Sequence, residues 1–158
     1  MRRHDREILN QNEINEILIN ASTIRVGFKG EEYPYIVPVS FGYDIKDGLP
    51  ILYFHCAKEG LKLDYLKQNP KVCVEADRFY KIEKLEHGIT TRYESVIGFG
   101  KCQIITDLNG KKEGLKRILD HYNQKDYALD RCKGIDNLII IEIKLEKITG
   151  KRNLPVPE

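Results

Sequence analysis

The chain has 158 residues, 41% of them hydrophobic and 32% charged, and a formal net charge of +2. This length is typical of one domain, so residues 1–158 are predicted to form a single domain. Acidic and basic residues are interspersed, which argues against a dedicated nucleic-acid binder with its basic stripe. No apolar run approaches the length that crosses a membrane, and the opening MRRHDREI lacks the apolar core of a secretory signal.

The cysteines are widely spread and form no Cys-x-x-Cys pair: Cys56, Cys73, Cys102 and Cys132. Neither a metal site nor a disulfide framework is predicted from this spacing. A soluble protein in a reducing, cytoplasmic setting is therefore the expectation.

The first helix is visible from its period alone. After a candidate cap, Asn10 or Asn12, apolar side chains recur at three- and four-residue spacing, namely Ile14, Ile17, Leu18 and Ala21. Residues 24–28 then alternate between apolar and polar side chains, which predicts a strand that turns at Lys29-Gly30.

Two prolines mark the next predicted strand, residues 33–43 (YPYIVPVSFGY). Proline donates no ladder hydrogen bond, so Pro34 and Pro38 require a sheet edge, a bulge, or a place where the ladder is given up to something else. A flat ligand bound to a broken strand edge would account for them. Asp47-Gly48 then predicts a tight hairpin turn.

The stretch from Ile51 to Leu66 (ILYFHCAKEGLKLDYL) contains the clearest candidate site. A strand is predicted to stop at His55 and to be followed by a helix that carries Lys58 and Lys62 on one face. Unpaired N–H groups at a helix start, together with an ammonium group, favour a phosphate. Two alternatives stay open: both lysines are simply solvated, and His55 is a structural histidine instead of a proton donor.

The second half of the chain adds strands and one more helix. The predicted elements are a short strand at 72–77, a strand end and loop at 78–88, a long strand at 90–106, a helix at 110–122 and a last strand at 138–148. Gly98 and Gly100 in the long strand mark a bend or a close approach of another backbone or ligand. Six strands arriving as hairpins favour a mainly β, α+β fold, an antiparallel barrel with peripheral helices.

A polar group precedes these glycines. Ser95, next to Arg92 and Tyr93, is a candidate phosphate ligand, with an ordinary polar surface as the alternative. Gly98-Phe99-Gly100 is no dinucleotide fingerprint, because no third glycine follows and no helix starts there. The chain contains no GxxxxGK[ST] loop. It also contains no GxSxG elbow, so acyl-transfer hydrolysis has no support.

Four segments together resemble the flavin-binding split-barrel family related to pyridoxamine 5′-phosphate oxidase. They are MRRHDREI, YPYIVPVSFGY, LYFHCAKEGLKLDYLKQNPKVCVEAD and YESVIGFGK, and the resemblance runs from Arg2 to about Lys151. Its most specific parts are the HxAxxGxK element and the VPVSF strand. Within this family the chain is most similar to the 5-nitroimidazole resistance, or nitroimidazole reductase, branch. The resemblance implies a six-stranded, FMN-binding split β-barrel.

The resemblance also implies a homodimer with FMN at the subunit interface. His55 is the implied catalytic residue and Lys62 the implied phosphate ligand. Tyr93, Ser95 and Val96 would complete the phosphate and ribityl pocket, with the strand of the same subunit as a candidate source. The full expected set of cofactor-binding residues is Val37, Pro38, Val39, Ser40, Phe54, His55, Cys56, Ala57, Gly60, Lys62, Tyr93, Ser95 and Val96.

The implied function is an FMN-dependent oxidoreductase that takes hydride from a nicotinamide donor, or electrons from another reductant, and reduces a small acceptor such as a nitroaromatic compound. FAD is less expected, because a compact pocket favours FMN. Leu61-Lys62 stands where pyridoxamine phosphate oxidases proper carry Arg-Lys. Pyridoxamine phosphate is therefore not expected to be the substrate. Two competing hypotheses remain: a flavin- or haem-binding barrel that stores or senses its ligand without turnover, and a structural barrel with no ligand.

Overall fold

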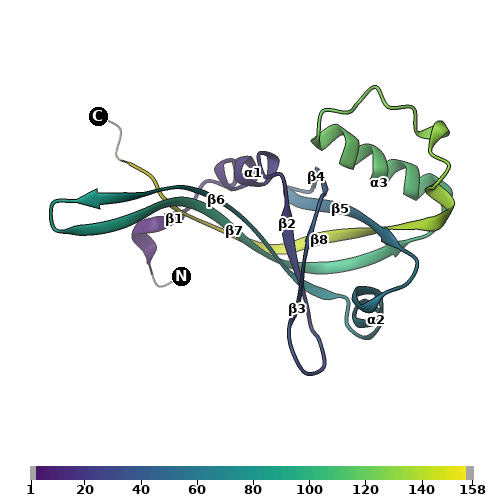
Figure 1. Ribbon diagram of the computed structural model, residues 1–158, viewed down its shortest axis with the longest axis horizontal. Helices are drawn as coiled ribbons and strands as arrows, with labels where there is room; N and C mark the ends of the chain where they lie inside the picture. The colour runs from purple at the N-terminus through teal and green to yellow at the C-terminus, as the bar shows by residue number, and fades with distance from the viewer. Residues whose placement is uncertain (1–2, 156–158) are drawn as a thin grey trace.

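The computed structural model describes residues 3–155 of the chain (Figure 1). Arg2, where the resemblance begins, and residues 156–158 of the C-terminal tail lie outside the described residues. The elements are η1 (His4–Arg6), β1 (Glu7–Ile8), α1 (Gln11–Ile19), β2 (Ile24–Phe28), β3 (Tyr35–Val39), β4 (Gly42–Lys46), β5 (Leu49–Ala57), α2 (Leu61–Gln68), β6 (Lys71–Leu85), β7 (Gly88–Ile105), α3 (Leu108–His121), η2 (Leu129–Arg131), η3 (Ile135–Asn137) and β8 (Leu138–Asn153). Over the described range, no helix is long and apolar enough to cross a membrane.

One antiparallel sheet holds the eight strands, in the order β3-β2-β6-β7-β8-β5-β4 with β1 beside β8. Its two edge strands, β3 and β4, are consecutive in the chain and are joined only by Ser40 and Phe41. Two residues can join opposite edges only if the sheet curls until those edges come close. Because β3 and β4 are not hydrogen-bonded to each other in this order, the barrel stays split. The predicted antiparallel split β-barrel with peripheral helices is therefore confirmed.

The number of strands differs from the predicted six. The single strand predicted at 33–43 is two strands, because the chain leaves one sheet edge at Val39 and joins the other at Gly42. The other addition is β1, which pairs with Gly150 and Lys151 of β8 and is too short to produce a periodic signal.

Several local predictions are confirmed. The side chain of Asn10 caps α1 by accepting the Asn12 N–H at 2.9 Å. Pro38 lies in β3, which has a ladder partner on one side only, so the sheet edge is the correct alternative among those predicted. Asp47 and Gly48 have positive φ angles of 53° and 79° and join β4 to β5, as a two-residue hairpin requires.

The inner face of the curled sheet forms the main hydrophobic core. Val26, Val74 and Ile143 point into it from three different strands, and α1 and α2 add their buried leucines, Leu18 and Leu63. Helix α3 lies on the outer face at one end of the sheet, where its Ile118 joins a second buried cluster with Ile51, Tyr53 and Ile140 (Figure 1). The remainder of the outer face is not covered by α3.

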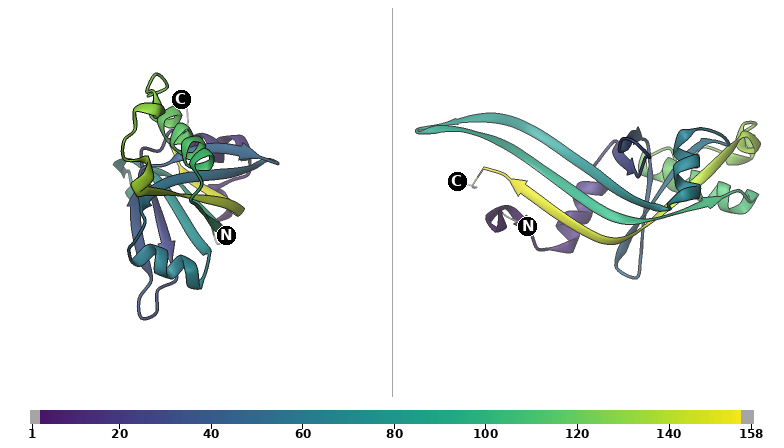
Figure 2. Two further views of the ribbon diagram at one scale, coloured as in Figure 1. Left: turned by 90° about the vertical axis from the view of Figure 1, so that its right-hand side faces the viewer. Right: turned by 90° about the horizontal axis from the view of Figure 1, so that it is seen from below.

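Strands β6 and β7 extend beyond the barrel as a long two-stranded arm (Figure 2). The strand end and loop predicted at 78–88 is wrong, because β6 continues to Leu85 and pairs with β7 as far as Gly88. Residues 78–88 contain many charged side chains, so they do not show the apolar–polar alternation that indicates a strand. Lys81 and Arg92 both form ion pairs with Glu83, so one face of the arm is held by charges instead of apolar contacts.

Gly100 marks a close approach of another backbone, as predicted, whereas Gly98 leaves room for the Leu145 side chain. A Cβ atom at Gly100 would lie 2.2 Å from the carbonyl oxygen of Lys144, and the register between β7 and β8 shifts at this point. The extra residue on β8 is Glu146, and a bulge of this kind reverses the in–out alternation of the residues that follow it. Strand β8 runs in this reversed alternation past its predicted end at residue 148 to Asn153.

Candidate functional site

Strand β5 carries His55 and continues beyond it, although it was predicted to stop there. His55 and Ala57 pair with Ile140 and Leu138 of β8. Pleating turns Phe54 and Cys56 toward the core, where both are buried, and turns His55 and Ala57 to the outer face, where both are exposed. His55 is therefore accessible to a ligand.

The connector Ser40–Phe41 lies beside this part of β5. The register of the β4–β5 hairpin ends with Gly42 paired to Tyr53, and Ser40–Phe41 leads from there to β3. Phe41 is fully buried, whereas Ser40 is exposed. The turn between the two sheet edges thus presents one exposed hydroxyl.

The end of α3 holds this connector in place. The Tyr122 hydroxyl accepts the Phe41 N–H at 3.1 Å and donates to the Ser22 carbonyl oxygen at 2.7 Å. The His121 ring packs on Phe41 with centroids 4.2 Å apart. Because the N–H of Phe41 is bonded to Tyr122 and its ring packs on His121, the adjacent Ser40 is restrained with it.

The helix after β5 begins at Leu61, so the prediction that Lys58 and Lys62 share one helix face is wrong. Gly60 is the physical reason. Its φ of 132° is a conformation that other residues rarely adopt, and it places the N-cap at Gly60 and leaves Lys58 in the preceding loop. Lys62 alone lies in the first turn of α2.

The start of α2 has the features of an anion site. Gly60 provides no side-chain cap, so the N–H groups of Leu61 and Lys62 have no partner within the helix. Burial raises the pKa of the Cys56 thiol at the end of β5, and the Lys62 ammonium opposes that rise. Only residues 58–60 separate β5 from α2, so the helix start follows His55 closely along the chain.

The second group of predicted residues lies elsewhere on the sheet. The register sets His55 and Ile105 of β7 on either side of Ile140 of β8, and Ser95 is ten residues (105 − 95) along β7 from Ile105. That separation is roughly 30 Å at the usual rise of a strand. Tyr93 and Ser95 of one subunit therefore cannot share a small pocket with His55 of that subunit, which corrects the expectation of a same-subunit source.

Lys151 belongs to this second group and was missed by the sequence reasoning. It pairs with Ser95, and its ammonium lies 5.9 Å from the centroid of the Tyr93 ring. The bulge at Glu146 reverses the alternation of β8 before Lys151, so a simple period-two pattern assigns this residue to the wrong face. Only its pairing with Ser95 shows that Lys151 lies on the outer face, and this pairing joins residues far apart in the sequence.

The predicted cofactor residues divide by the face of the sheet. Pro38, Ser40, His55, Ala57, Tyr93 and Ser95 lie on the outer face or at its edge, and Gly60 and Lys62 lie at the start of α2. Five others turn their side chains toward the core and can offer only backbone groups to a ligand: Val37, Val39, Phe54, Cys56 and Val96. Which of them contact a cofactor stays a prediction.

The described cysteines are all free, and no group of three metal-ligating side chains comes together in the described part of the chain. We expect Cys102 to react very slowly with iodoacetamide at pH 8 while the protein is folded. Burial raises its pKa to about 12, so its thiolate fraction is roughly a thousandfold below that of a free cysteine. Peptide mass mapping with and without denaturant measures this, and rapid labelling of the folded protein would contradict the burial of Cys102.

The fold defines a split-barrel protein with an exposed histidine near the end of β5, an uncapped helix start after that strand and a short connector between the two sheet edges. The family model described as "Pyridoxamine 5′-phosphate oxidase" matches residues 10–152. The chain therefore belongs to the pyridoxamine 5′-phosphate oxidase family, as its resemblance predicts.

Solved structures share this fold. A putative 5-nitroimidazole antibiotic resistance protein from Bacteroides thetaiotaomicron has a TM-score of 0.81 and 28% identity, covering 92% of this chain and 85% of its own. The flavocytochrome Anf3 from Azotobacter vinelandii has a TM-score of 0.78 and 18% identity, and the match covers 100% of this chain and 75% of that one. An FAD and heme binding protein from Mycobacterium smegmatis has a TM-score of 0.78 and 15% identity, and the match covers 97% of this chain and 77% of that one. No curated protein matches the chain.

Proposed function

We propose that this protein is an FMN-dependent oxidoreductase that reduces small acceptors, with nitroaromatic compounds of the 5-nitroimidazole type as the candidate class. Family membership supports a flavin site, and one structural observation carries the proposal. His55 lies on the exposed side of β5 near its end, the uncapped start of α2 follows after residues 58–60, and the Ser40–Phe41 connector adjoins the β4–β5 hairpin. The protein thus offers a binding site for a phosphate, a strand edge for a flat ring, and a histidine that can exchange protons.

The start of α2 fits the phosphate of the cofactor. The N–H groups of Leu61 and Lys62 have no helical partner, and the Lys62 ammonium adds a full positive charge. Asp64 lies in the same turn, but its carboxylate is within 3.7 Å of the Lys67 ammonium, which offsets its charge. These groups would bind the phosphate and orient the rest of the molecule toward β3 and β5.

The free edge of β3 fits the ring. Residues 37–39 have a ladder partner only in β2, so their remaining backbone groups are available to a heteroaromatic edge. Pro38 and Ser40 add an apolar surface and a hydroxyl on the exposed side. A bound flavin supplies hydride and electron transfer, and the protein supplies orientation and electrostatics.

His55 would hold or deliver a proton to the acceptor. An imidazole titrates near neutral pH and can act through either ring nitrogen. Its position on the exposed outer face allows a small acceptor to reach it from solvent without a change in the core. A nicotinamide donor would use the same open side.

The proposed active form is a homodimer. Tyr93 and Ser95 are too far from His55 to contact the same flavin within one subunit, so a pocket that uses both groups requires two subunits. Lys151, next to Ser95, would add a second positive charge to such a pocket. The cytoplasmic location expected from the sequence stays a prediction.

We expect the purified protein to bind FMN, to be reduced anaerobically by NADH or NADPH and to be reoxidised by a nitroimidazole. His55→Ala is expected to retain flavin and to lose about a hundredfold in nitroreduction, the usual contribution of a positioned acid or base. Absorbance and stopped-flow spectra measure both steps. His4→Ala, which removes an exposed imidazole paired with Glu7, is the matched control.

Two results would contradict this account. A protein that stays colourless after incubation with FMN has no flavin site of the proposed kind. Unchanged turnover in His55→Ala removes the role of that residue. Mass spectrometry of the released cofactor distinguishes FMN from FAD.

A second candidate function is flavin or haem binding without turnover. It is favoured by the shared fold of the flavocytochrome and of the FAD and heme binding protein, each with a TM-score of 0.78. A visible spectrum shows which ligand is bound. Bound flavin that neither nicotinamide reduces, or that a nitro compound fails to reoxidise, supports this second function over the first.

A further inference from the structure

Two consecutive side chains at the end of α3 bond to two segments that are far apart in the sequence. His121 Nε2 lies 2.8 Å from the Ala21 carbonyl oxygen and donates to it, because a carbonyl oxygen can only accept. The Tyr122 hydroxyl donates to the Ser22 carbonyl oxygen at 2.7 Å and accepts the Phe41 N–H at 3.1 Å. We call His121 and Tyr122 the α3 clamp, since they join the loop between α1 and β2 to the connector between β3 and β4.

The two segments meet at one end of the β2–β3 pair. Ile24, the first residue of β2, comes two residues after Ser22 and pairs with Val39, the last residue of β3. The connector follows Val39 directly. The α3 clamp therefore ties both strands to one helix at the end of the ladder that contains residues 37–39, the candidate edge for the flavin ring.

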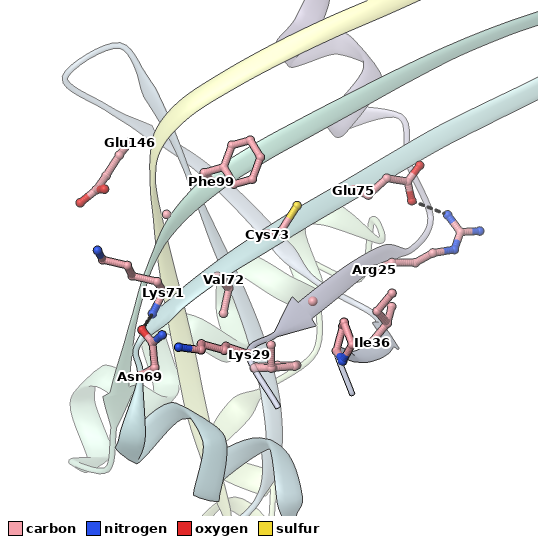
Figure 3. Close-up of a pocket in the computed structure, with 14 residues that line it drawn as sticks. Arg25, Lys29, Ile36, Asn69, Lys71, Val72, Cys73, Glu75, Phe99 and Glu146 are labelled. Carbon is pink, nitrogen blue, oxygen red and sulfur yellow. Dashed lines mark hydrogen bonds and ion pairs between the residues drawn. The ribbon is translucent and has the colours of Figure 1, made fainter. Parts of the chain in front are cut away.

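Strand β3 has few other contacts that hold it in place. It is an edge strand of five residues, and its ladder partner is β2 alone. Its outer face forms one wall of a groove of about 650 Å³, where the Ile36 side chain is 63% exposed (Figure 3). A strand that is open along one edge and along one face frays from its ends. We therefore expect the clamp to decide how well the end of β3 is ordered.

The α3 clamp is itself firmly packed. The His121 ring lies on Phe41 with centroids 4.2 Å apart, and its centroid is 4.9 Å from that of the Tyr122 ring. Helix α3 is held on the sheet by Ile118 and by the close approach of Gly42 to the helix backbone. Phe41 is fully buried, so its N–H cannot reach water and depends on the Tyr122 hydroxyl as acceptor. Loss of that hydroxyl is therefore felt at the connector.

We propose that His121 and Tyr122 are positioning residues of the flavin site, which hold the free edge of β3 where it receives the ring. This inference rests on the proposed function. It assigns the clamp to the ring and not to the phosphate, because the hydrogen bonds of the clamp go to residues 21, 22 and 41, whereas the phosphate site at the start of α2 follows β5. An edge that is already ordered binds a flat ligand more tightly, since less conformational freedom is lost on binding.

Hydrogen exchange of flavin-free protein tests the clamp itself. Tyr122→Phe leaves the buried Phe41 N–H without its acceptor, so we expect this amide to exchange about tenfold faster by NMR, the usual worth of one hydrogen bond. Tyr127→Phe is the matched control, because Tyr127 lies five residues further along (127 − 122) and is 50% exposed. An unchanged exchange rate at Phe41 in a folded Tyr122→Phe protein overturns the proposal.

Flavin binding tests the assignment to the ring. Riboflavin lacks the phosphate of FMN, so we expect Tyr122→Phe to weaken both ligands by the same factor of about ten. The absorption maximum of the bound flavin should also move toward that of free flavin, which a loss of stability alone would not cause. Lys62→Ala should weaken FMN and leave riboflavin unchanged. Weaker binding of FMN alone in Tyr122→Phe, or native affinity and spectrum, overturns the positioning role.

A second variant keeps the test decisive. Should Tyr122→Phe fail to fold by circular dichroism, His121→Phe takes its place, because it keeps a ring on Phe41 but removes the bond to Ala21. The same loss of affinity for both flavins is expected. Native protein that binds neither FMN nor riboflavin removes the proposed function and the positioning role with it, whereas native binding that both variants leave unchanged removes the positioning role alone.

Discussion

A mixture of two variants that fail to bind flavin, Lys62→Glu and Ser95→Asp, is expected to regain about a quarter of the flavin sites of the native protein. Each substitution sets a carboxylate against the cofactor phosphate, and such a like-charge contact costs several kcal/mol. We therefore expect each variant alone to bind FMN at least a hundredfold more weakly than the native chain.

Recovery follows from the separation of the two residues in the fold. If Lys62 of one subunit and Ser95 of its partner form one pocket, a mixed dimer has one pocket with both substitutions and one with neither. Random reassociation makes about half of the dimers mixed, and each of these has one intact pocket out of two. The expected yield is about a quarter of all sites, with native affinity.

The measurement is an FMN titration, followed by quenching of flavin fluorescence, after the two variants are dissociated and reassociated together. Lys58→Glu is the matched control, because the structure places Lys58 in the loop before α2, so reversal of its charge should leave binding close to native. No recovery in the mixture, with both variants folded and dimeric, would show that the two residues do not complete each other's pockets across the interface.

Gly42→Val is expected to lower the free energy of unfolding by about 4 kcal/mol or more, which is exceptional for one substitution. A Cβ atom at Gly42 would lie 2.5 Å from the backbone carbon of Arg117 and 2.5 Å from the backbone nitrogen of Ile118. These are main-chain atoms of α3, so no rotation of a side chain relieves the overlap. The helix must move away from β4.

Displacement of α3 also affects the candidate site. Tyr122, at the end of this helix, fixes the Phe41 N–H and hence the connector that presents Ser40. We therefore expect Gly42→Val to weaken FMN binding even at temperatures where it remains folded. Urea unfolding followed by circular dichroism measures the stability, with FMN affinity measured in parallel.

Gly134→Ala is the control for the loss of a glycine. Gly134 has no atom within 4 Å of the Cβ position, and its φ of −88° suits any residue, so stability should be unchanged or slightly higher. A Gly42→Val protein as stable as the native chain would mean that α3 does not rest on β4 as described.

Much of the local structure follows from the sequence, because its causes lie within a few residues. The spacing of Ile14, Ile17 and Leu18 is sufficient for α1, and the positive φ angles required by a two-residue hairpin are met by Asp47-Gly48. The HxAxxGxK element, with its neighbours, was sufficient to place the chain in its family. These signals concern propensity and periodicity, which act along the chain.

The start of α2 shows where such signals reach their limit. Lysines four residues apart were expected to share a helix face, but the extended backbone is carried through Gly60 at a φ of 132° and the helix begins only after it. The long arm escaped prediction for a different reason, since its strands are charged on the face that Glu83 and Arg92 hold together. In both cases the pattern of residue types was compatible with two conformations.

Only the tertiary structure decided which predicted residues can meet. Whether 33–43 is one strand or two depends on the curl of the sheet, which brings its opposite edges close without pairing them. The face occupied by Lys151 depends on a bulge defined by pairing with β7, and the separation of His55 from Ser95 depends on the register of three strands. The sequence by itself determined the family, the Asp47-Gly48 turn and the HxAxxGxK element that begins at His55. The separation of the two groups of predicted site residues comes from pairing between residues far apart in the chain, which no local pattern specifies.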